Sequence, residues 1–454
     1  IVPGIRAKNR LLIVTSLVFY SFGQPQYIVL LLFSVCLNYA AGRLLCSGPF
    51  LRCGRIVMAG AIVLNIGILA VFKYLDFALE NINALFHSSM SLPGIVLPIG
   101  ISFYTFQGLS YVIDVYRDRS MASRSFTKLL LYISFFPQLI AGPIVKYHDV
   151  AQMIDNRRTS PELTANGLRR FIIGLSKKLL IANAAGAVAD RVFALDAGSL
   201  DMRVAWLGAV CYTLQIYFDF SGYSDMAIGL GKIFGFRFAE NFDHPYGSTS
   251  IKEFWRRWHI SLSTWFKEYL YIPLGGNRKG RARTSINKII VFFTTGLWHG
   301  ANWTFVVWGL YHGFFLLLED YIPKLKKLPK VLGHIYAVLV VCIGFVIFRA
   351  DDMGQACAMI AKMFTGLSFS AQSVSLVWQV LTPYSIVMLI AGILLAAPIP
   401  MLYEKLVSNG RIMKTERGRA AGSAVAYAVS LALVCWCLLR LSGNTYNPFI
   451  YFRF

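Results

Sequence analysis

The residues best suited to chemistry are histidines set in apolar, tryptophan-rich sequence. His299 ends the apolar run 289–298 and is followed at once by a glycine and then by Asn302. The tryptophans on either side of it are Trp298 and Trp303. A histidine held at a helix break can take up and release protons, because its pKa lies near neutrality and is tuned by burial. Its surroundings alone support catalysis and a structural role about equally.

A second histidine, His259, lies in the segment 252–271, which mixes aromatic and charged residues. The aromatic positions recur at the spacing of one stripe on an amphipathic helix, and charged residues such as Arg256 fall mostly on the other side. We therefore predict one continuous helix here, with Trp258 and His259 facing inward. Tryptophan and arginine together suit a membrane interface. On the residues alone, a satisfied core histidine is favoured over a catalyst.

A third polar segment, 217–231, carries two acids within apolar sequence. Asp219 and Asp225 would each cost a few kcal/mol if they faced lipid. They are six residues apart and cannot share one helical face, and Gly222 between them suggests a break. The segment is either the lining of a polar cavity or a structural hydrogen-bond network capping two half-helices, with the second slightly favoured. The candidate tunnel or substrate-binding residues here are Asp219, Ser221, Tyr223 and Asp225.

The composition shows what must position these residues. The chain has 454 residues, of which 56% are hydrophobic and only 15% charged, with a mean hydropathy of +0.57. A soluble protein this apolar could not cover its surface, so a soluble enzyme and a disordered chain are excluded. The 44 basic residues against 22 acidic ones fit basic loops that orient a membrane protein better than a nucleic-acid partner. We predict an all-α, polytopic membrane protein that contacts lipid.

The apolar runs are of two kinds. An interruption at Gln24-Pro25-Gln26 divides the run 11–41 into two segments. Cleaner spans are predicted at 56–72, 331–348, 385–402 and 424–439. Less regular stretches, several with Pro, Gly, His or Asp, lie at 95–116, 129–145, 168–189, 204–235, 252–274 and 287–318. Since irregular backbone survives at membrane depth only inside protein or beside a watery cavity, we expect ten or more helices with the irregular ones forming a functional centre.

Other catalytic signatures are missing from the sequence. The eight cysteines form no C-x-x-C pair and no Cys/His ligand spacing, so we expect neither a metal site nor a disulfide framework. There is no G-x-S-x-G, Walker or H-E-x-x-H motif. No histidine is followed four or five residues later by an aspartate. The chain begins at Ile1 without a cleavable signal pattern, and we expect further residues upstream.

Several segments together resemble the membrane-bound O-acyltransferase (MBOAT) family, and are most similar to its bacterial alginate O-acetyltransferase type. The resemblance covers nearly the whole chain. The segments that carry it are 97–107, 111–117, 136–143, 217–231, 237–246, 253–263, 269–277, 296–300 and 448–454.

The resemblance implies a single MBOAT membrane domain over 1–454, with a catalytic core at about 204–319. Its fold would be a ring of tilted transmembrane and re-entrant helices around an acyl-transfer tunnel, in a bacterial inner membrane. The family's catalytic histidine corresponds to His299 in Trp-His-Gly. The supporting histidine corresponds to His259 in Trp-Arg-Arg-Trp-His.

The resemblance also implies a reaction. An acetyl group would pass from a cytoplasmic thioester, acetyl-CoA, to an extracellular or cell-wall polysaccharide, with His299 as general base and no permanently bound cofactor. Trp298 and Trp303 would shape a water-poor pocket. The arginines Arg256, Arg257 and those of 278–283 would hold donor phosphates, or are ordinary positive-inside residues. The immediate acceptor would be a serine of an SGNH hydrolase-like partner.

Three alternatives stay open at this point. D-alanyl transfer to teichoic acid uses similar motifs, but its proteins generally lack the Tyr-Ile-Pro-Leu-Gly-Gly-Asn loop found here at 271–277, so acetyl transfer is preferred. A transporter suits broken helices and intramembrane acids, although inverted repeats are missing. A scaffold that only anchors a transferase is the third.

Overall fold

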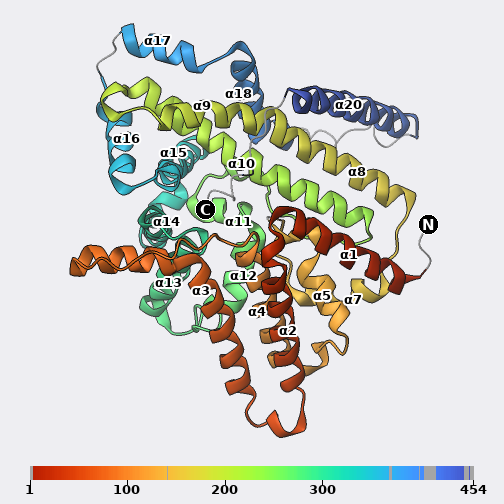
Figure 1. The fold of residues 1–454 in the computed structure, drawn as a ribbon. Helices are drawn as coiled ribbons and strands as arrows, with labels where there is room; N and C mark the ends of the chain where they lie inside the picture. The colour runs from red at the N-terminus through yellow and green to blue at the C-terminus, as the bar shows by residue number, and fades with distance from the viewer. Residues whose placement is uncertain are drawn as a thin grey trace. The chain divides into compact units, whose positions relative to one another are not determined.

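In the computed structural model, all regular elements of the described residues are helices (Figure 1). This confirms the predicted all-α class. The described residues fall into two compact units, and neither unit is one continuous stretch of chain. The structure describes residues 4–140, 142–367, 371–397, 399–402, 416–443 and 449. Of the segment 448–454, which contributed to the resemblance, all but Phe449 lies outside the described residues.

Five helical stretches among the described residues are long and apolar enough to cross a membrane. They are Pro25–Leu44, Gly54–Phe86, Pro161–Phe193, Lys330–Arg349 and Ala421–Ser442. Large apolar side chains are exposed on several of them, for example Ile56 and Leu431, and such surface suits lipid rather than water. The chain is therefore a multi-pass membrane protein, as predicted.

One predicted interruption is confirmed by the structure, and one predicted membrane span is wrong. The interruption at residues 24–26 is confirmed, because α1 (Ile5–Gly23) and α2 (Ile28–Leu44) are separate helices joined by the short turn η1 (Pro25–Tyr27). The clean span predicted at 385–402 is wrong. There, α18 (Pro383–Ala396) is only 14 residues long, and its axis is bent by 84° from the preceding helical segment Val374–Val380. This pair counts at most as a sixth, broken span.

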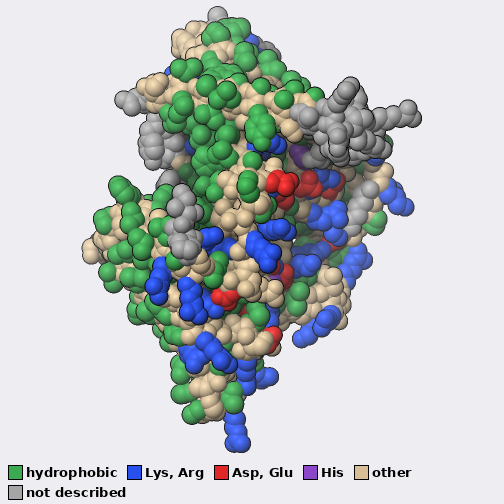
Figure 2. Space-filling model, turned by 90° about the vertical axis from the view of Figure 1, so that its right-hand side faces the viewer, with side chains coloured by type: hydrophobic (Ala, Val, Ile, Leu, Met, Phe, Trp, Pro, Cys, Tyr) green, Lys and Arg blue, Asp and Glu red, His purple; other side chains and the backbone are tan. Residues whose placement is uncertain are grey.

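Basic side chains are grouped on the surface. Figure 2 shows one face of the molecule, on which Lys and Arg side chains gather together while hydrophobic side chains occupy other areas. Such grouping is typical of a membrane protein whose basic loops set its orientation. Which side faces the cytoplasm stays a prediction.

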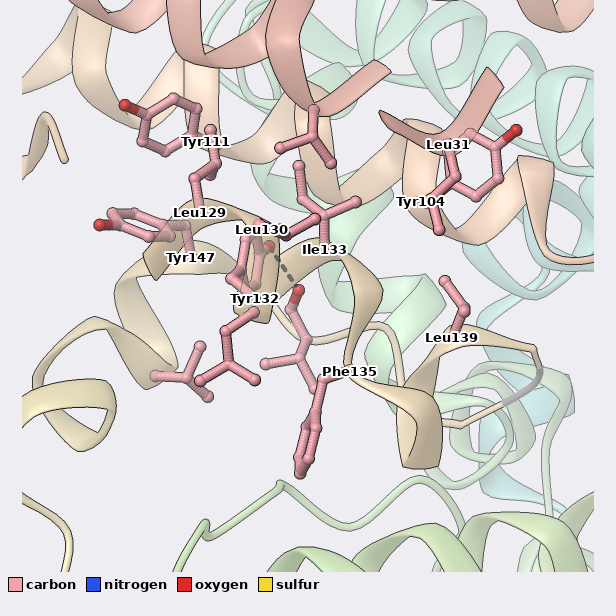
Figure 3. Packing of buried hydrophobic residues seen from close by; sticks show 14 of the residues in the cluster. Leu31, Tyr104, Tyr111, Leu129, Leu130, Tyr132, Ile133, Phe135, Leu139 and Tyr147 are labelled. Atoms are coloured by element: carbon pink, nitrogen blue, oxygen red, sulfur yellow. Dashed lines mark hydrogen bonds between the residues drawn. The ribbon is translucent and has the colours of Figure 1, made fainter. Parts of the chain in front are cut away.

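The first unit holds an apolar core built around α4 (Ile101–Arg117), in which almost every residue is buried. Tyr104 of α4 belongs to the same buried cluster as Leu129 and Ile133, and Figure 3 shows Leu31 beside it. This unit comprises residues up to 168 together with 227–239 and 267–269. Its remaining helices are α1, α2, α3 (Gly54–Phe86), α5 (Phe126–Ser134), α6 (Phe136–Leu139) and α7 (Tyr147–Asn156).

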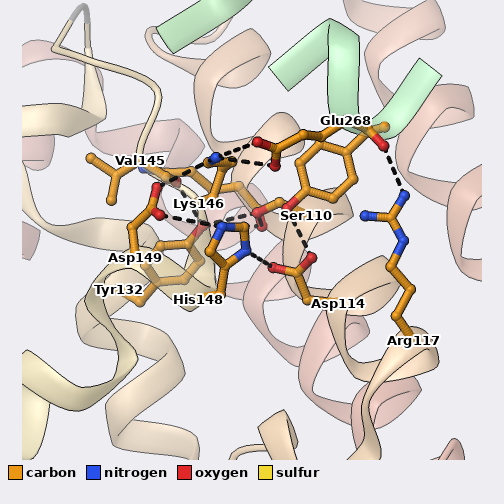
Figure 4. A network of polar contacts seen from close by, with 11 residues as sticks. Ser110, Asp114, Arg117, Tyr132, Val145, Lys146, His148, Asp149 and Glu268 are labelled. Carbon is orange, nitrogen blue, oxygen red and sulfur yellow. Dashed lines mark hydrogen bonds and ion pairs between the residues drawn. The ribbon is translucent and has the colours of Figure 1, made fainter. Parts of the chain in front are cut away.

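A polar network in the same unit surrounds Asp114, a buried acid on α4 (Figure 4). One carboxylate oxygen accepts a hydrogen bond from the Tyr269 hydroxyl at 2.9 Å, and the other lies 2.8 Å from His148 Nδ1. Burial, with the Asp114 charge adding to it, raises the pKa of Tyr269, so its phenol stays a donor. Lys146 pairs with Glu268 at 2.9 Å. These contacts hold residues 267–269 against α4 and α7.

The second unit contains the segments with candidate site residues. It comprises 169–226, 240–266 and the chain from 270 onward. Its elements include the second half of α8 (Pro161–Ser176) and most of α10 (Met202–Ile233). The others are the π turn η4 (Lys177–Ala182), α9 (Asn183–Phe193), η6 (Pro245–Gly247), α11 (Ile251–Arg257), α12 (Ile260–Phe266), α13 (Gly280–His299), α14 (Trp303–Tyr321), α15 (Lys330–Arg349), α16 (Met353–Thr365), α17 (Ala371–Val380), α18 and α20 (Glu416–Ser442).

Glycines allow two close helix contacts in this unit. Where α13 meets α14, a methyl group added at Gly296 or Gly309 would overlap the backbone of the other helix. Where α8 meets α10, a methyl group added at Gly222 would lie 2.7 Å from Gly174 O. Small residues permit such approach in membrane helices. The predicted break at Gly222 is therefore wrong: α10 runs through it without interruption, and the glycine is the crossing point.

Candidate active site

His299 lies in an aromatic enclosure at the end of α13. Its side chain is buried, and Gly300, which ends the helix, is extended. The ring centroid of His299 lies 5.0 Å from that of Trp298, 5.0 Å from that of Trp308 and 5.1 Å from that of Phe348. Walls of this kind exclude water and strengthen electrostatic interactions inside. The geometry suits proton transfer to or from a group that reaches the imidazole.

His259 lies at a sharp bend and not within a helix. The single helix predicted over 252–271 is wrong, because α11 ends at Arg257, α12 begins at Ile260, and a π turn, η7 (Lys267–Tyr271), follows. The backbone of His259 is left-handed, with φ of +43°. The aromatic stripe is nevertheless buried as predicted, and His259 itself is only 1% exposed.

A neighbouring loop provides the hydrogen bonds that replace the helical ones at this bend. Asp243 N donates to Arg257 O at 2.9 Å, and Ile260 N donates to Asn241 O at 2.9 Å. One bond satisfies the end of α11 and the other the start of α12. Tertiary contact thus overrides the helical period in the sequence. Periodicity alone could not reveal the break.

The start of α11 is fixed by two side chains. Ser250 accepts a hydrogen bond from Glu253 N at 3.1 Å, which is a standard N-cap. Glu319 of α14, buried at 1% exposure, accepts from Ile251 N at 2.5 Å and Lys252 N at 3.1 Å. A carboxylate is favourable at this end of a helix dipole. Sequence reasoning missed Glu319, although an acid inside an apolar run was a usable signal.

Two charged side chains of α11, Glu253 and Arg257, form polar contacts within the second unit. Burial alone would raise the pKa of the Glu253 carboxyl, but hydrogen bonds from Thr249 and Arg257 outweigh it and lower that pKa. Arg257 donates to Glu253 at 2.9 Å and lies 3.6 Å from Asp243. Arg256, by contrast, is exposed. Of these two arginines, Arg256 is better placed to meet a phosphate.

The two candidate histidines share one aromatic neighbour. The Trp298 ring centroid lies 6.0 Å from that of His259 and 5.0 Å from that of His299. Phe220 of α10 packs edge-on against His259 at 4.6 Å. Trp258, also buried, packs 5.4 Å from Phe254. The predicted residues His259, Trp258, Trp298 and His299 are thus gathered in one region.

Two other predicted residues, Asn302 and Trp303, lie at the start of α14. Asn302 is the N-cap of α14: its Oδ1 accepts from Thr304 N at 3.0 Å, and its Nδ2 donates to Asp351 O at 2.8 Å. Trp303 is 54% exposed, so it is poorly placed to close a water-poor pocket. Trp308 packs on His299 instead, and no local sequence feature distinguishes these two tryptophans.

The acids of α10 are held in ion pairs. Lys178 lies 2.6 Å from Asp219, Lys177 lies 2.7 Å from Asp225, and Arg170 lies 2.6 Å from Asp225. Such pairing favours the structural-network interpretation over a free polar lining, although no half-helices are involved. Among the other candidates, Ser221 is buried and Tyr223 is half-buried, 4.8 Å from the ring of Phe449.

Metal ligands are not gathered anywhere in the part of the chain that the structure describes. No group of three His, Cys, Asp or Glu side chains there could hold a metal ion. All eight cysteines have free thiols.

These features define a multi-pass helical membrane protein with buried histidines in an apolar, aromatic site. Residues 117–350 match the membrane-bound O-acyltransferase family. The chain belongs to this family and is an O-acyltransferase. This excludes the scaffold and transporter alternatives as its main activity.

Proteins similar to this chain are named as acetyl- or D-alanyl-transferring proteins. The chain is 39% identical to a "probable alginate O-acetylase AlgI" of Azotobacter vinelandii, over 99% of this chain and 95% of the relative. It is 37% identical to a peptidoglycan O-acetyltransferase of Helicobacter pylori, over 79% and 75% respectively. It is 27% identical to a teichoic acid D-alanyltransferase of Bacillus subtilis, over 68% and 80%.

Proposed function

We propose that this chain transfers an acetyl group from a cytoplasmic thioester, acetyl-CoA, across the membrane for O-acetylation of an extracellular or cell-wall polysaccharide. The observation that carries the chemistry is the buried His299, enclosed by Trp298, Trp308 and Phe348. A thioester is already activated. The barrier therefore lies mainly in activating the hydroxyl nucleophile and in excluding water.

The proposed step uses His299 as general base. The imidazole removes the proton of the acceptor hydroxyl while the hydroxyl oxygen bonds to the acetyl carbonyl carbon. The carbon–sulfur bond then breaks, and the thiolate leaves and takes up a proton to become the thiol of CoA. General-base assistance of this kind is typically worth about 10²–10⁴-fold. The aromatic walls disfavour hydrolysis of the thioester by keeping water away.

The comparisons support acetyl transfer over D-alanyl transfer. The O-acetylases are 37–42% identical to this chain, against 27–30% for the D-alanyltransferases. The loop 271–277, which D-alanyl proteins generally lack, points the same way. In the structure, Asn287 Nδ2 donates to Gly276 O at 3.0 Å and so fixes this loop to α13.

The proposal also assigns residues that bind the acetyl donor and a partner protein that receives the acetyl group. The exposed residues Arg256, Arg278, Lys279, Arg281 and Arg283 supply positive charge for the phosphates of acetyl-CoA. Arg281 is already engaged, since it donates to Asp320 O and lies over the Tyr321 ring. The immediate acceptor is a serine of an SGNH hydrolase-like partner outside the cytoplasm, which passes the acetyl group to the sugar.

The test compares a strain that carries His299→Ala with the parent strain. Mass spectrometry of the acids released by mild base from envelope and exopolysaccharide measures ester-linked acetate and D-alanine. We expect acetate to fall by about 10²–10⁴-fold if His299 is the base.

The matched control is His87→Asn. His87 is exposed and ends α3 with a φ of +51°, a conformation that Asn tolerates. Both variants are compared at equal protein levels in the membrane. A selective loss of D-alanine would move the protein to the teichoic acid branch. Unchanged release of both acids would overturn the role of His299.

A further inference from the structure

Asn241 is a buried residue, at 1% exposure, that no sequence motif singled out as functional. The orientation of its amide is fixed by a backbone group. Ser261 N can only donate, and it lies 3.2 Å from the atom assigned as Asn241 Oδ1. An amide nitrogen at that position would place two donors against each other. On its other side, Asn241 Nδ2 donates to Ser224 Oγ at 3.0 Å, which agrees with this orientation.

The same oxygen faces the ring of His259. Asn241 Oδ1 lies 3.1 Å from His259 Nδ1. Because a carbonyl oxygen has only lone pairs to offer, this contact is favourable only when Nδ1 carries a hydrogen. Ser261 Oγ does not offer Nδ1 a better donor, since it lies 2.8 Å from Asn241 Oδ1 but 3.5 Å from His259 Nδ1.

The remaining ring nitrogen must then carry a lone pair. No carboxylate of the described residues forms an ion pair with His259, and a buried imidazolium without one would be costly. The ring is therefore neutral, with its single hydrogen on Nδ1. Nε2 is enclosed and has no hydrogen-bond partner among the described residues. A buried acceptor left open beside Trp298, which also contacts His299, is a site that a ligand donor would satisfy.

We propose that Asn241 is a positioning residue: it holds His259 in the Nδ1–H tautomer, so that Nε2 accepts a hydrogen bond from a donor group of the bound acceptor other than the hydroxyl that His299 deprotonates. That this donor belongs to the acceptor rests on the proposed function. The tautomer does not, because the contacts of Asn241 determine it in the resting protein. Asn241 thus acts through His259 and touches no reacting atom.

The first test is spectroscopic and needs no activity. Nitrogen-15 NMR of histidine-labelled protein in bilayers separates protonated from unprotonated ring nitrogens, and the signals lost in His259→Gln identify His259. In the parent protein we expect a protonated Nδ1 and an unprotonated Nε2. An unprotonated Nδ1 of His259 in the parent protein would overturn the proposal outright, whatever the activity of any variant.

Variants at the same cluster separate the tautomer effect from simple loss of packing. Asn241→Leu removes the acceptor, and we expect the Nε2–H tautomer to appear. Asn241→Asp keeps an oxygen against Nδ1, which should stay protonated. The matched control Ser224→Ala removes only the partner of Nδ2 and should leave the Nδ1–H tautomer unchanged. An unchanged tautomer in Asn241→Leu would contradict the proposal.

Kinetics then link the tautomer to transfer. Asn241→Leu should lower kcat at least tenfold with little change in KM for acetyl-CoA, because the proposal assigns the Asn241–His259 pair to the acceptor and not to the donor. A rise in KM for acetyl-CoA without a fall in kcat would contradict this role toward the acceptor. If His299→Ala retained full acetyl release while the NMR result held, the proposed function would fail and the tautomer assignment would stand.

Discussion

At the residue scale, histidine occupies unusual backbone positions in this protein. The described residues other than glycine that have positive φ are His87, His244 and His259. Such a backbone costs about 1–3 kcal/mol and tends to mark functional sites. At His259 the cost coincides with a buried, open ring nitrogen. The residue type and its neighbours were visible in the sequence, but the left-handed bend was not, because the aromatic spacing fits an unbroken helix equally well.

The two tryptophans of α14 give a matched prediction. Trp308 is 1% exposed and packs on His299, whereas Trp303, five residues earlier, is 54% exposed. We expect Trp308→Ala to reduce the free energy of unfolding by about 3–5 kcal/mol and to lower acetyl transfer, because water reaches the His299 ring. Trp303→Ala should change stability by only about 0.5 kcal/mol.

The measurement for this pair is thermal unfolding in detergent together with acetyl release. Equal losses in the two variants would show that Trp308 is not a wall of the site. Sequence alone could not rank the two tryptophans, since both lie near His299 along the chain. The two residues lie five positions apart on α14 and therefore point in different directions. Only Trp308 packs on the imidazole.

At the element scale, a glycine within an apolar helix can mark either a break in the helix or a close crossing with another helix. The sequence alone does not distinguish the two. Gly222 indicated a break in α10, and the structure shows a crossing with α8 at Gly174. The acids on either side were correctly recognised as costly in lipid. Their partners, Lys177 and Lys178, lie more than 40 residues away along the chain. Nothing in local spacing connects them.

Glycine substitutions test the crossing. Gly222→Ala places a methyl group 2.7 Å from Gly174 O, and since both atoms belong to helix backbones, we expect a loss of about 1–3 kcal/mol in stability. The control is Gly67→Ala in α3, where nothing lies within 4 Å. Alanine there should be neutral or stabilising by about 0.5–1 kcal/mol.

The midpoint of unfolding in denaturant, measured for both purified variants, decides between these expectations. A Gly222→Ala variant as stable as the parent would mean that α8 and α10 do not approach each other so closely. The helix itself would then tolerate alanine, which is the better helix former.

At the scale of the whole molecule, composition and motifs predicted the most. The membrane class, the helical class and the family followed from residues that could be read directly, since apolar runs, basic loops and short motifs are local features. The division into two units did not follow. Residues 227–239 and 267–269 belong with the N-terminal part, and only long-range contacts such as that between Asp114 and Tyr269 determine this.

The proposed transfer across the bilayer predicts that donor and acceptor react when they are on opposite sides of the membrane. Vesicles containing the chain and the proposed SGNH-like partner would receive the proposed donor, acetyl-CoA, on one side and a polysaccharide acceptor on the other. We expect acetate esters to form on the acceptor, and His299→Ala to abolish them, because the membrane-embedded site is the only route between the two compartments. The readout is acceptor-bound acetate after the two sides are separated.

The vesicle experiment needs a leak control in which labelled CoA is followed across the membrane. Ester formation that requires donor and acceptor on the same side would contradict transfer through the bilayer. The overall acyltransferase activity would be unaffected by that result.

The π turn η4 at Lys177–Ala182 has a consequence for the direction in which α9 faces. A π turn is equivalent to one residue inserted into an α-helix, and one residue corresponds to a rotation of about 100°. The extra residue therefore offsets the face presented by α9 from the face presented by α8. It lies where two adjacent lysines reach two different aspartates. Deleting one residue from this turn would present another face of α9 to its neighbours, so the burial of the apolar residues of α9 depends on the π turn.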